Sequence, residues 1–310
     1  MKPADLPAFP TSAETPTSTA VVALPRDAAQ LGLALARTGY LADERTALVA
    51  HLALALGRSL LVEGPPGVGK TELARSLATA LERPLVRLQC YEGLDESRAV
   101  FEWNYAKQIL YTELHRGQAA AAELESAFYD ERFLVPRALY RAATSDVPVV
   151  LLIDEVDRAD PEFEALLLEF LGEGQLTIPE LGTIRQKHAP LVVLTSNGTR
   201  ELGDALRRRA LYLHLDYPEP SREQKILEAR VPGLGAALAA QVAHFCEQVR
   251  ALELRKRPSI SEAVDFARAL LLLNKGALDA AGAEAALATL VKYEEDRERV
   301  QPRLPALVTG

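Results

Sequence analysis

Residues 64–71 read Gly-Pro-Pro-Gly-Val-Gly-Lys-Thr, which is a glycine, four residues and then Gly-Lys-Thr. An apolar run, 59–63, precedes them, and leucines recur at helical spacing over 72–78. Such a strand, loop and helix bind phosphate, because glycines let backbone N–H groups close around an anion at the positive end of a helix. The alternative is a Gly/Pro-rich turn without a ligand. The Lys-Thr pair and both flanking elements favour phosphate binding.

The loop predicts the roles of its own residues. Lys70 is expected to reach the β- and γ-phosphates of a nucleotide, and the Thr71 hydroxyl is expected to hold Mg²⁺. Tyr40, in Gly39-Tyr40-Leu41, is either a contact on the base side or part of a plain helix connection. The predicted nucleotide-binding residues are Gly64, Pro65, Pro66, Gly67, Val68, Gly69, Lys70, Thr71, Glu72 and Tyr40.

Two acids end a second apolar run, 149–153, and supply what a phosphate loop lacks. A bound Mg²⁺ needs a carboxylate, and hydrolysis needs a residue that orients water. Asp154 is expected on the metal's side, through water, and Glu155 is expected to polarise the attacking water. Two acids after a strand are otherwise often a solvated turn or a helix N-cap. Their position after the phosphate loop favours the catalytic interpretation.

Composition disfavours nucleic-acid-binding, membrane-spanning and disulfide-rich proteins. The chain has 310 residues, enough for about two domains. Its net charge of −8 disfavours a broad grip on nucleic acid, so we expect no stable nucleic-acid binding. No apolar stretch approaches the roughly 20 residues of a membrane helix, and prolines interrupt any signal sequence at the start. Two isolated cysteines fit a reducing cytoplasm, and five scattered histidines predict no metal site.

Short apolar runs alternate with helical patterns over the middle of the chain. The runs 191–195, followed by Ser196-Asn197, and 211–215 add further strands, and 175–187 reads as a hairpin. This alternation predicts a parallel sheet covered on both faces. In such sheets ligands bind at the carboxyl ends of the strands, where Gly64, Asp154 and Asn197 fall.

Helices and an aromatic insertion complete this part. A helix over 43–56 is expected to carry Leu48, Leu52 and either His51 or Ala55 on one face. A further helix is expected over 124–143, with a break at Pro136. Phe101, Trp103 and Tyr105 alternate, so an extended segment would place them on one face. That face is either buried packing or a substrate-engaging surface.

The C-terminal third is predicted to be a small helical bundle after a proline-bearing hinge at 217–220. Ser221 with Gln224, and Ser259 with Glu262, each have the spacing of a capping box. The expected division is a flexible Pro/Ser/Thr-rich tail over 1–25, a nucleotide-binding domain over 26–217 and a helical lid domain over 218–310.

The order of these parts resembles an AAA+ ATPase over about residues 27–300. Within that superfamily the chain is most similar to the MoxR group, through Leu-Ile-Asp-Glu-Val-Asp-Arg-Ala at 152–159, the hairpin, and the arginines ahead of Asp-Tyr-Pro at 216–218. Segments 90–105 and 201–209 resemble the CoxD-type branch, whose members are associated with maturation of the molybdenum and copper centre of aerobic carbon monoxide dehydrogenase.

The resemblance implies a fold and further site residues. The expected fold is a P-loop αβα sandwich with a five-stranded parallel sheet, followed by an all-helical lid. Asn197 matches the sensor that helps place the attacking water. Arg207, Arg208 and Arg209 match the arginine-finger region, with Arg208 favoured, whereas three adjacent arginines on their own would suggest a solvated charge run. At the lid position of a second sensor arginine, either Arg257 substitutes or lid sensing is weak.

The resemblance also implies an activity and partners. The expected protein is a cytoplasmic ATPase with ATP and Mg²⁺ as cofactors, and the resemblance implies assembly as a ring, with a hexamer as the expected form. A von Willebrand A-domain adaptor and a client metalloenzyme are its expected partners, and remodelling of that client is its expected work. The alternatives are a nucleotide-dependent assembly scaffold that remodels nothing and a DNA-handling AAA+ motor, against which the acidic balance counts.

Overall fold

A five-stranded parallel sheet forms the centre of the computed structural model, which describes residues 24–115, 129–178 and 181–309. This confirms the predicted parallel sheet. The strand order is β2-β5-β8-β1-β9. The strands read as nearly continuous apolar runs because helices cover both faces of the sheet. Their bounds are β1 (Ser59–Glu63), β2 (Leu85–Gln89), β5 (Val150–Asp154), β8 (Leu191–Ser196) and β9 (Ala210–His214).

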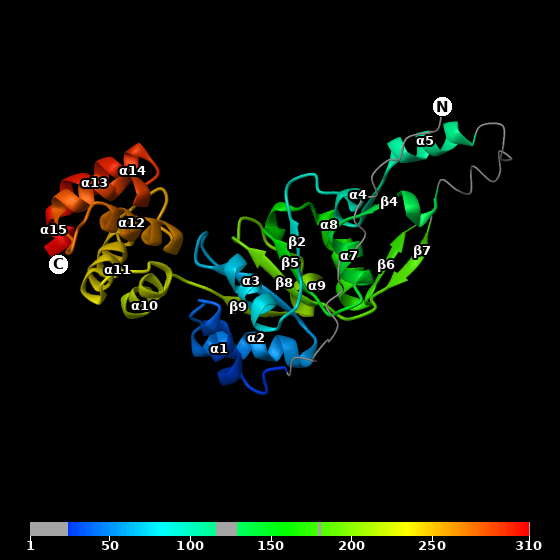
Figure 1. The fold of residues 1–310 in the computed structure, drawn as a ribbon, viewed down its shortest axis with the longest axis horizontal. Helices are drawn as coiled ribbons and strands as arrows, with labels where there is room; N and C mark the ends of the chain where they lie inside the picture. Colours follow the sequence, from blue (N-terminus) through cyan, green and yellow to red (C-terminus); the bar gives the residue numbers. More distant parts are fainter. Residues whose placement is uncertain (1–23, 116–128, 179–180, 310) are drawn as a thin grey trace, which may run out of the picture.

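The two faces of the sheet bury different helices, as Figure 1 shows around the central strands. Leu60 and Val62 of β1 point into one apolar cluster, and Leu61 between them points into the other, as the alternation of a strand requires. The first cluster includes side chains of α1 (Ala28–Arg37), α2 (Glu44–Leu56) and α3 (Lys70–Ala80). The second includes side chains of α7 (Ala138–Thr144), α8 (Pro161–Gly172) and α9 (Asp204–Arg209).

The face that α2 buries is not the predicted one. Leu48 and Leu52 are exposed, and the buried residues are small: Thr46, Ala47, Ala50 and Ala53. The reason is the close approach of α1, since a Cβ added to Gly32 would lie only 3.5 Å from Cβ of Ala47. Because α1 packs so closely, α2 buries its small side chains and leaves Leu48 and Leu52 exposed.

The aromatic insertion is built of short elements between β2 and β5. They are α4 (Glu96–Ala99), β3 (Phe101–Trp103), α5 (Tyr105–Leu114), a 3₁₀ turn (Glu131–Phe133) and β4 (Leu134–Pro136), which pairs with β3. The rings of Phe101 and Trp103 meet edge to face, 5.4 Å apart. Tyr105 does not share their face, because Asn104 caps α5 by accepting a hydrogen bond from the Lys107 N–H, and Tyr105 starts that helix exposed.

The helix predicted over 124–143 is also corrected. Residues 124–128 lie outside the described residues, and the 3₁₀ turn and β4 occupy much of the remainder before α7 begins at Ala138. The predicted hairpin is confirmed as β6 (Gln175–Ile178) and β7 (Gly182–Arg185). In Figure 1, α5 and this hairpin lie at the end of the molecule opposite the C-terminal helices.

The C-terminal helices pack around an apolar cluster of their own. On α11, Leu238, Val242, Phe245 and Val249 form a buried stripe. The capping box of Ser259 and Glu262 is confirmed at the start of α12. The one predicted at Ser221 is wrong, because α10 already begins at Pro220. The helices are α10 (Pro220–Arg230), α11 (Ala236–Arg250), α12 (Ile260–Leu272), α13 (Ala280–Leu290), α14 (Glu294–Val300) and α15 (Leu304–Thr309).

Across the three described stretches of the chain, no helix is long and apolar enough to cross a membrane.

Candidate functional site

The phosphate loop connects β1 to α3, and its glycines lie where a side chain would not fit. A Cβ on Gly64, at φ 156°, would fall 1.9 Å from the Leu215 carbonyl oxygen. A Cβ on Gly67, at φ 77°, would fall 2.2 Å from Cβ of Ser259, the N-cap residue of α12. The loop is therefore held between β9 and the C-terminal helices, and it turns directly into the N-terminus of α3.

Lys70 points back across this loop. Its Nζ donates to the carbonyl oxygens of Gly64 at 2.6 Å and Pro65 at 2.7 Å, and to Oδ1 of Asn197 at 2.8 Å. Burial lowers the pKa of the Lys70 ammonium, while Asp157 and the neighbouring acids oppose that shift by stabilising the charge. A desolvated cation between loop carbonyls and the end of β8 is suited to a polyanionic ligand.

Asp154 lies at the end of β5 with its two carboxylate oxygens in different contacts. Oδ1 accepts from the hydroxyls of Thr71, at 2.9 Å, and Thr195, at 2.6 Å. Oδ2 accepts from the guanidinium of Arg87 on β2 at 2.7 Å. A hydroxyl and a carboxylate oxygen in contact are the donors that Mg²⁺ prefers when phosphates and water supply its other ligands. Within the described residues, no group of three His, Cys, Asp or Glu side chains could hold a metal alone.

Glu155 follows with an unusual backbone. Its φ of 56° and ψ of 50° place it in the left-handed region, which costs a non-glycine residue free energy and is frequent at functional sites. Its Oε2 accepts from Gln89 Nε2 at 3.2 Å and from Arg158 at 3.0 Å. The turn aims the carboxylate away from the strand axis, toward the same cavity that Lys70 lines.

Asn197 ends β8 in the position predicted for it. Its backbone N–H donates to Oδ2 of Asp157 at 3.2 Å. Burial raises the pKa of Asp157, but hydrogen bonds from Thr199 and Asn197 outweigh it, so the pKa lies below its ordinary value. The carboxylate thus stays charged beneath the Asn197 turn.

Most of the predicted phosphate-side residues line one cavity of about 350 Å³, whereas Gly64 and Pro65 line neither this cavity nor a second one beside it, and Val68 lines only the second. The first cavity brings together the carboxyl ends of β1, β5 and β8, as the parallel sheet predicts. Its described lining is Pro66, Gly67, Gly69, Lys70, Thr71, Glu72, Arg75, Asp154, Glu155, Thr195, Asn197 and Ser261.

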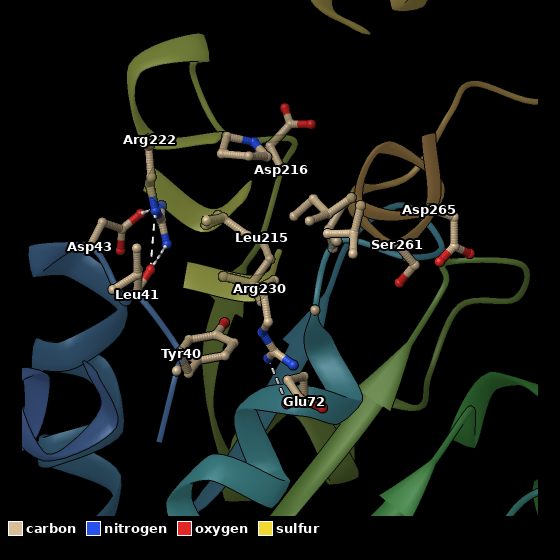
Figure 2. A pocket seen from close by; sticks show the side chains of 18 of the residues that line it. Tyr40, Leu41, Asp43, Glu72, Leu215, Asp216, Arg222, Arg230, Ser261 and Asp265 are labelled. Carbon is tan, nitrogen blue, oxygen red and sulfur yellow. Dashed lines mark hydrogen bonds and ion pairs between the residues drawn. The ribbon is translucent and has the colours of Figure 1, made fainter. Parts of the chain in front are cut away.

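A second cavity, of about 300 Å³, continues from the first between the loop before α2 and the C-terminal helices (Figure 2). Tyr40 forms part of its wall, and a Cβ on Gly69 would lie 3.5 Å from the Tyr40 ring. Burial raises the pKa of the Tyr40 hydroxyl, which therefore stays protonated. Much of the remaining wall is apolar, as a nucleobase requires: Leu41, Val68, Leu215, Ile226, Ile260 and Val264.

Two arginines of α10 fasten the C-terminal helices over this cavity, as the dashed lines in Figure 2 mark. Nη2 of Arg222 donates to the Leu41 carbonyl oxygen at 2.7 Å, and Nη1 pairs with Oδ2 of Asp43 at 2.8 Å. Arg230 pairs at 2.7 Å with Glu72, in the first turn of α3. The C-terminal helices line one side of the cavity, and the phosphate loop lines the other.

Of the two alternatives for the C-terminal helices, the position of Arg257 favours weak lid sensing. Arg257 is exposed and is absent from the lining of both cavities. Ser261, in the first turn of α12, lines both instead. Arg257 lies two residues before Ser259, the N-cap residue of α12, and the chain approaches the phosphate loop only at Ser259.

The three predicted finger arginines end α9, away from this chain's own cavities. Arg207 pairs with Glu63 at 3.4 Å, and Arg209 donates to the Ala205 carbonyl oxygen at 3.1 Å. Arg208 is exposed, and its carbonyl oxygen accepts from Arg58. Glu72 lines both cavities and Tyr40 lines the second, whereas these arginines line neither.

Sequence reasoning missed Arg87, Gln89, Asp157, Arg222 and Arg230. Arg87 and Gln89 left a signal, since they alternate with Val86 and Leu88 and so point to one face of β2. Asp157 lies within the acidic motif itself. The two α10 arginines left none, because their partners lie on α3 and before α2, more than 150 residues away.

Comparison with known proteins identifies relatives of this arrangement. Residues 59–210 match the AAA domain of the dynein-related subfamily. An uncharacterized protein of Staphylococcus haemolyticus is 30% identical over 227 residues, covering 71% of this chain and 78% of that protein. Chaperone protein ClpB 2 of Thermosynechococcus vestitus is 30% identical over 208 residues, covering 63% of this chain but 21% of the relative. The chain therefore spans about a fifth of that chaperone.

Among solved structures, a RuvB variant of Thermotoga maritima is 17% identical, with a TM-score of 0.47. The match covers 78% of this chain and 65% of that chain.

Proposed function

We propose that this chain, whose residues 59–210 match an AAA domain, is an AAA+ ATPase that couples Mg²⁺-dependent ATP hydrolysis to the remodelling of a client protein, as a chaperone of the MoxR group. The observation that carries the proposal is the convergence of Lys70, Thr71, Asp154, Glu155 and Asn197 on one cavity, with an apolar cavity beside it. A triphosphate and an adenine base would occupy these two cavities.

The side chains divide the work of hydrolysis. Lys70 would balance charge on the β- and γ-phosphates, and Asn197, already within 2.8 Å of Lys70, would hold the γ-phosphate side by its amide. Thr71 and Asp154 would hold Mg²⁺, which neutralises phosphate charge when bound. Glu155 would orient the attacking water, after its carboxylate leaves Gln89 and Arg158.

A neighbouring subunit would complete the site. Arg207, Arg208 and Arg209 do not line the chain's own phosphate cavity, whereas Arg75 of α3 does, so any of those three that neutralises the transition state would act on the site of another copy. We assign that role to Arg208, whose side chain is exposed. A closed ring, with six subunits as our working number, would give every site such a donor.

The client belongs to the finer part of the proposal. The MoxR-like motif at 152–159 and the CoxD-like segments at 90–105 and 201–209 support a metalloenzyme client with a von Willebrand A-domain adaptor. The client we propose is a molybdenum-containing CO dehydrogenase, whose active site would be matured. The relation to ClpB chaperones supports remodelling in general. Two buried free thiols, Cys90 and Cys246, fit work in a reducing cytoplasm.

ATP turnover with and without a client tests this proposal. Purified protein is assayed with Mg²⁺ and ATP, alone and with the apo form of a molybdenum-containing CO dehydrogenase plus the adaptor. A chaperone predicts faster turnover together with ATP-dependent gain of client activity. Slow hydrolysis that ignores the client would support the assembly scaffold. Salt-dependent binding of duplex DNA would support the DNA motor instead.

A further inference from the structure

The chain segment 197–209 joins the two parts of the proposed ATPase that must act on different subunits. At one end, Oδ1 of Asn197 contacts Lys70 in the chain's own phosphate cavity. At the other end, α9 carries the three arginines. Contacts that hold the middle of segment 197–209 therefore also set the position of the arginines relative to the sheet.

Asp157 fastens the first part of this segment. Its buried Oδ2 accepts three hydrogen bonds, from the N–H of Asn197 at 3.2 Å, the N–H of Thr199 at 3.0 Å and the Thr199 hydroxyl at 2.6 Å. The turn after β8 is therefore fixed to the connection after β5, close to the phosphate cavity.

Glu164 of α8 fastens the second part, at the start of the arginine helix. Its Oε2 accepts from the N–H of Gly203, the residue that precedes α9, at 2.9 Å. Its Oε1 pairs with Arg200 at 2.6 Å, and Arg200 also donates to the Ala159 carbonyl oxygen at 2.8 Å. The Glu164 carboxylate is thus buried and contacts both Gly203 and Arg200 of the same loop.

The fit at Gly203 leaves little freedom. A Cβ there would lie 2.8 Å from Oε2 of Glu164, so the backbone touches the carboxylate. Leu202 and Leu206, on either side, are buried in the sheet's apolar cluster. Six residues are too few for a helix to be stable alone, so α9 depends on these contacts for its position.

We propose that Glu164 is a positioning residue for the arginine donor: it holds the start of α9 so that Arg208 meets the phosphate cavity of the neighbouring copy. The proposal rests on arginine supply in trans, as set out above. Losing the carboxylate leaves the Gly203 N–H without its acceptor and Arg200 without its partner, and α9 then shifts. The chain's own nucleotide site, built on Lys70 and Glu155, keeps its contacts.

Assemblies mixed from two variants separate the donation of an arginine from the hydrolysis of ATP in the chain's own site. Glu155→Gln subunits donate arginines but do not hydrolyse, and Arg208→Ala subunits accept arginines but do not donate them. Mixing the two in equal amounts restores ATP hydrolysis if arginines act in trans. The test compares Glu155→Gln/Glu164→Ala donors with Glu155→Gln/Glu162→Ala donors, because Glu162 is an exposed acid on the same helix. The assembled mass of each mixture is measured alongside.

We expect the Glu164→Ala donors to restore about tenfold less hydrolysis than the Glu162→Ala donors, in mixtures of equal mass. In the converse mixture, Glu164→Ala subunits beside Glu155→Gln donors should hydrolyse ATP, because their own sites are intact. Glu164→Gln donors, which keep an oxygen for Gly203, should fall between the two.

Three results would overturn the assignment. Full restoration by Glu164→Ala donors would show that Glu164 does not position the arginines. Failure of Glu164→Ala subunits as acceptors as well as donors would show a general folding defect. If Glu155→Gln donors with intact Glu164 restore nothing, the arginine supply in trans is itself refuted, and the inference falls with it.

Discussion

Gly67→Ala would test whether nucleotide binding depends on the approach of the C-terminal helices to the phosphate loop. The new Cβ meets Cβ of Ser259 at 2.2 Å, far inside contact distance. The start of α12 has to retreat from the loop before the chain can close. Placing alanine at φ 77° also costs about 1–2 kcal/mol of unfolding free energy, whether or not nucleotide is bound.

The expected loss of nucleotide affinity follows from the residues of the cavity wall that move with α12. Ile260, Val264 and Ser261 belong to that helix, and Ile226 to α10, which packs against it. If a base loses about 60–80 Å² of contact with this wall, the loss at about 25 cal/mol per Å² is about 1.5–2 kcal/mol. That corresponds to about a ten- to thirtyfold weaker affinity for ADP or ATP. Titration with a fluorescent nucleotide measures it directly.

Gly69→Ala is the matched control. Its φ of 99° imposes similar backbone strain, but its Cβ would lie 3.5 Å from the Tyr40 ring, an ordinary contact. We expect it to lose comparable unfolding free energy and to bind nucleotide more tightly than Gly67→Ala does. Ser259→Gly, which costs an N-cap only a few tenths of a kcal/mol, should restore binding to Gly67→Ala. Equal affinities for the two alanine variants, or no rescue, would refute the closure argument.

Three further predictions concern the site and the insertion. Lys70→Ala should abolish nucleotide binding, whereas Glu155→Gln should bind ATP and lose hydrolysis by about a hundredfold or more; a Glu155→Gln protein with normal turnover would exclude Glu155 from the mechanism. Trp103→Ala should keep basal hydrolysis and weaken stimulation by a client, and collapse of basal turnover would make the aromatic insertion structural. Burial raises the pKa of Cys90 to about 12 and also raises that of Cys246, so neither thiol should react with a disulfide reagent at pH 8 until the chain unfolds; rapid labelling of native protein would contradict their burial.

Local patterns predicted the elements that depend on local physics. The Gly-Lys-Thr loop and the capping box at Ser259 carry their hydrogen-bond partners within a few residues, so the pattern implies the structure. The sheet was also predictable, because buried parallel strands must be apolar on both faces.

The errors came where a tertiary contact outweighed a local pattern. The leucine stripe of α2 was the stronger local signal, but α1 approaches so closely that alanines face inward. Pro220, with φ fixed for a first helical turn, began α10 ahead of Ser221. The contacts of Arg222, Arg230 and Arg87 join residues far apart in the chain, and nothing in the neighbouring sequence specifies them.

The central claim is that an arginine of one copy completes the site of the next. The most direct test is the mass in solution with ATP and Mg²⁺ of the wild type and of Arg208→Ala, followed by the ATPase rate of the same samples. We predict that both form the same ring and that only the wild type hydrolyses ATP at its normal rate. A monomer that hydrolyses ATP equally well with and without the Arg208 side chain would contradict the claim.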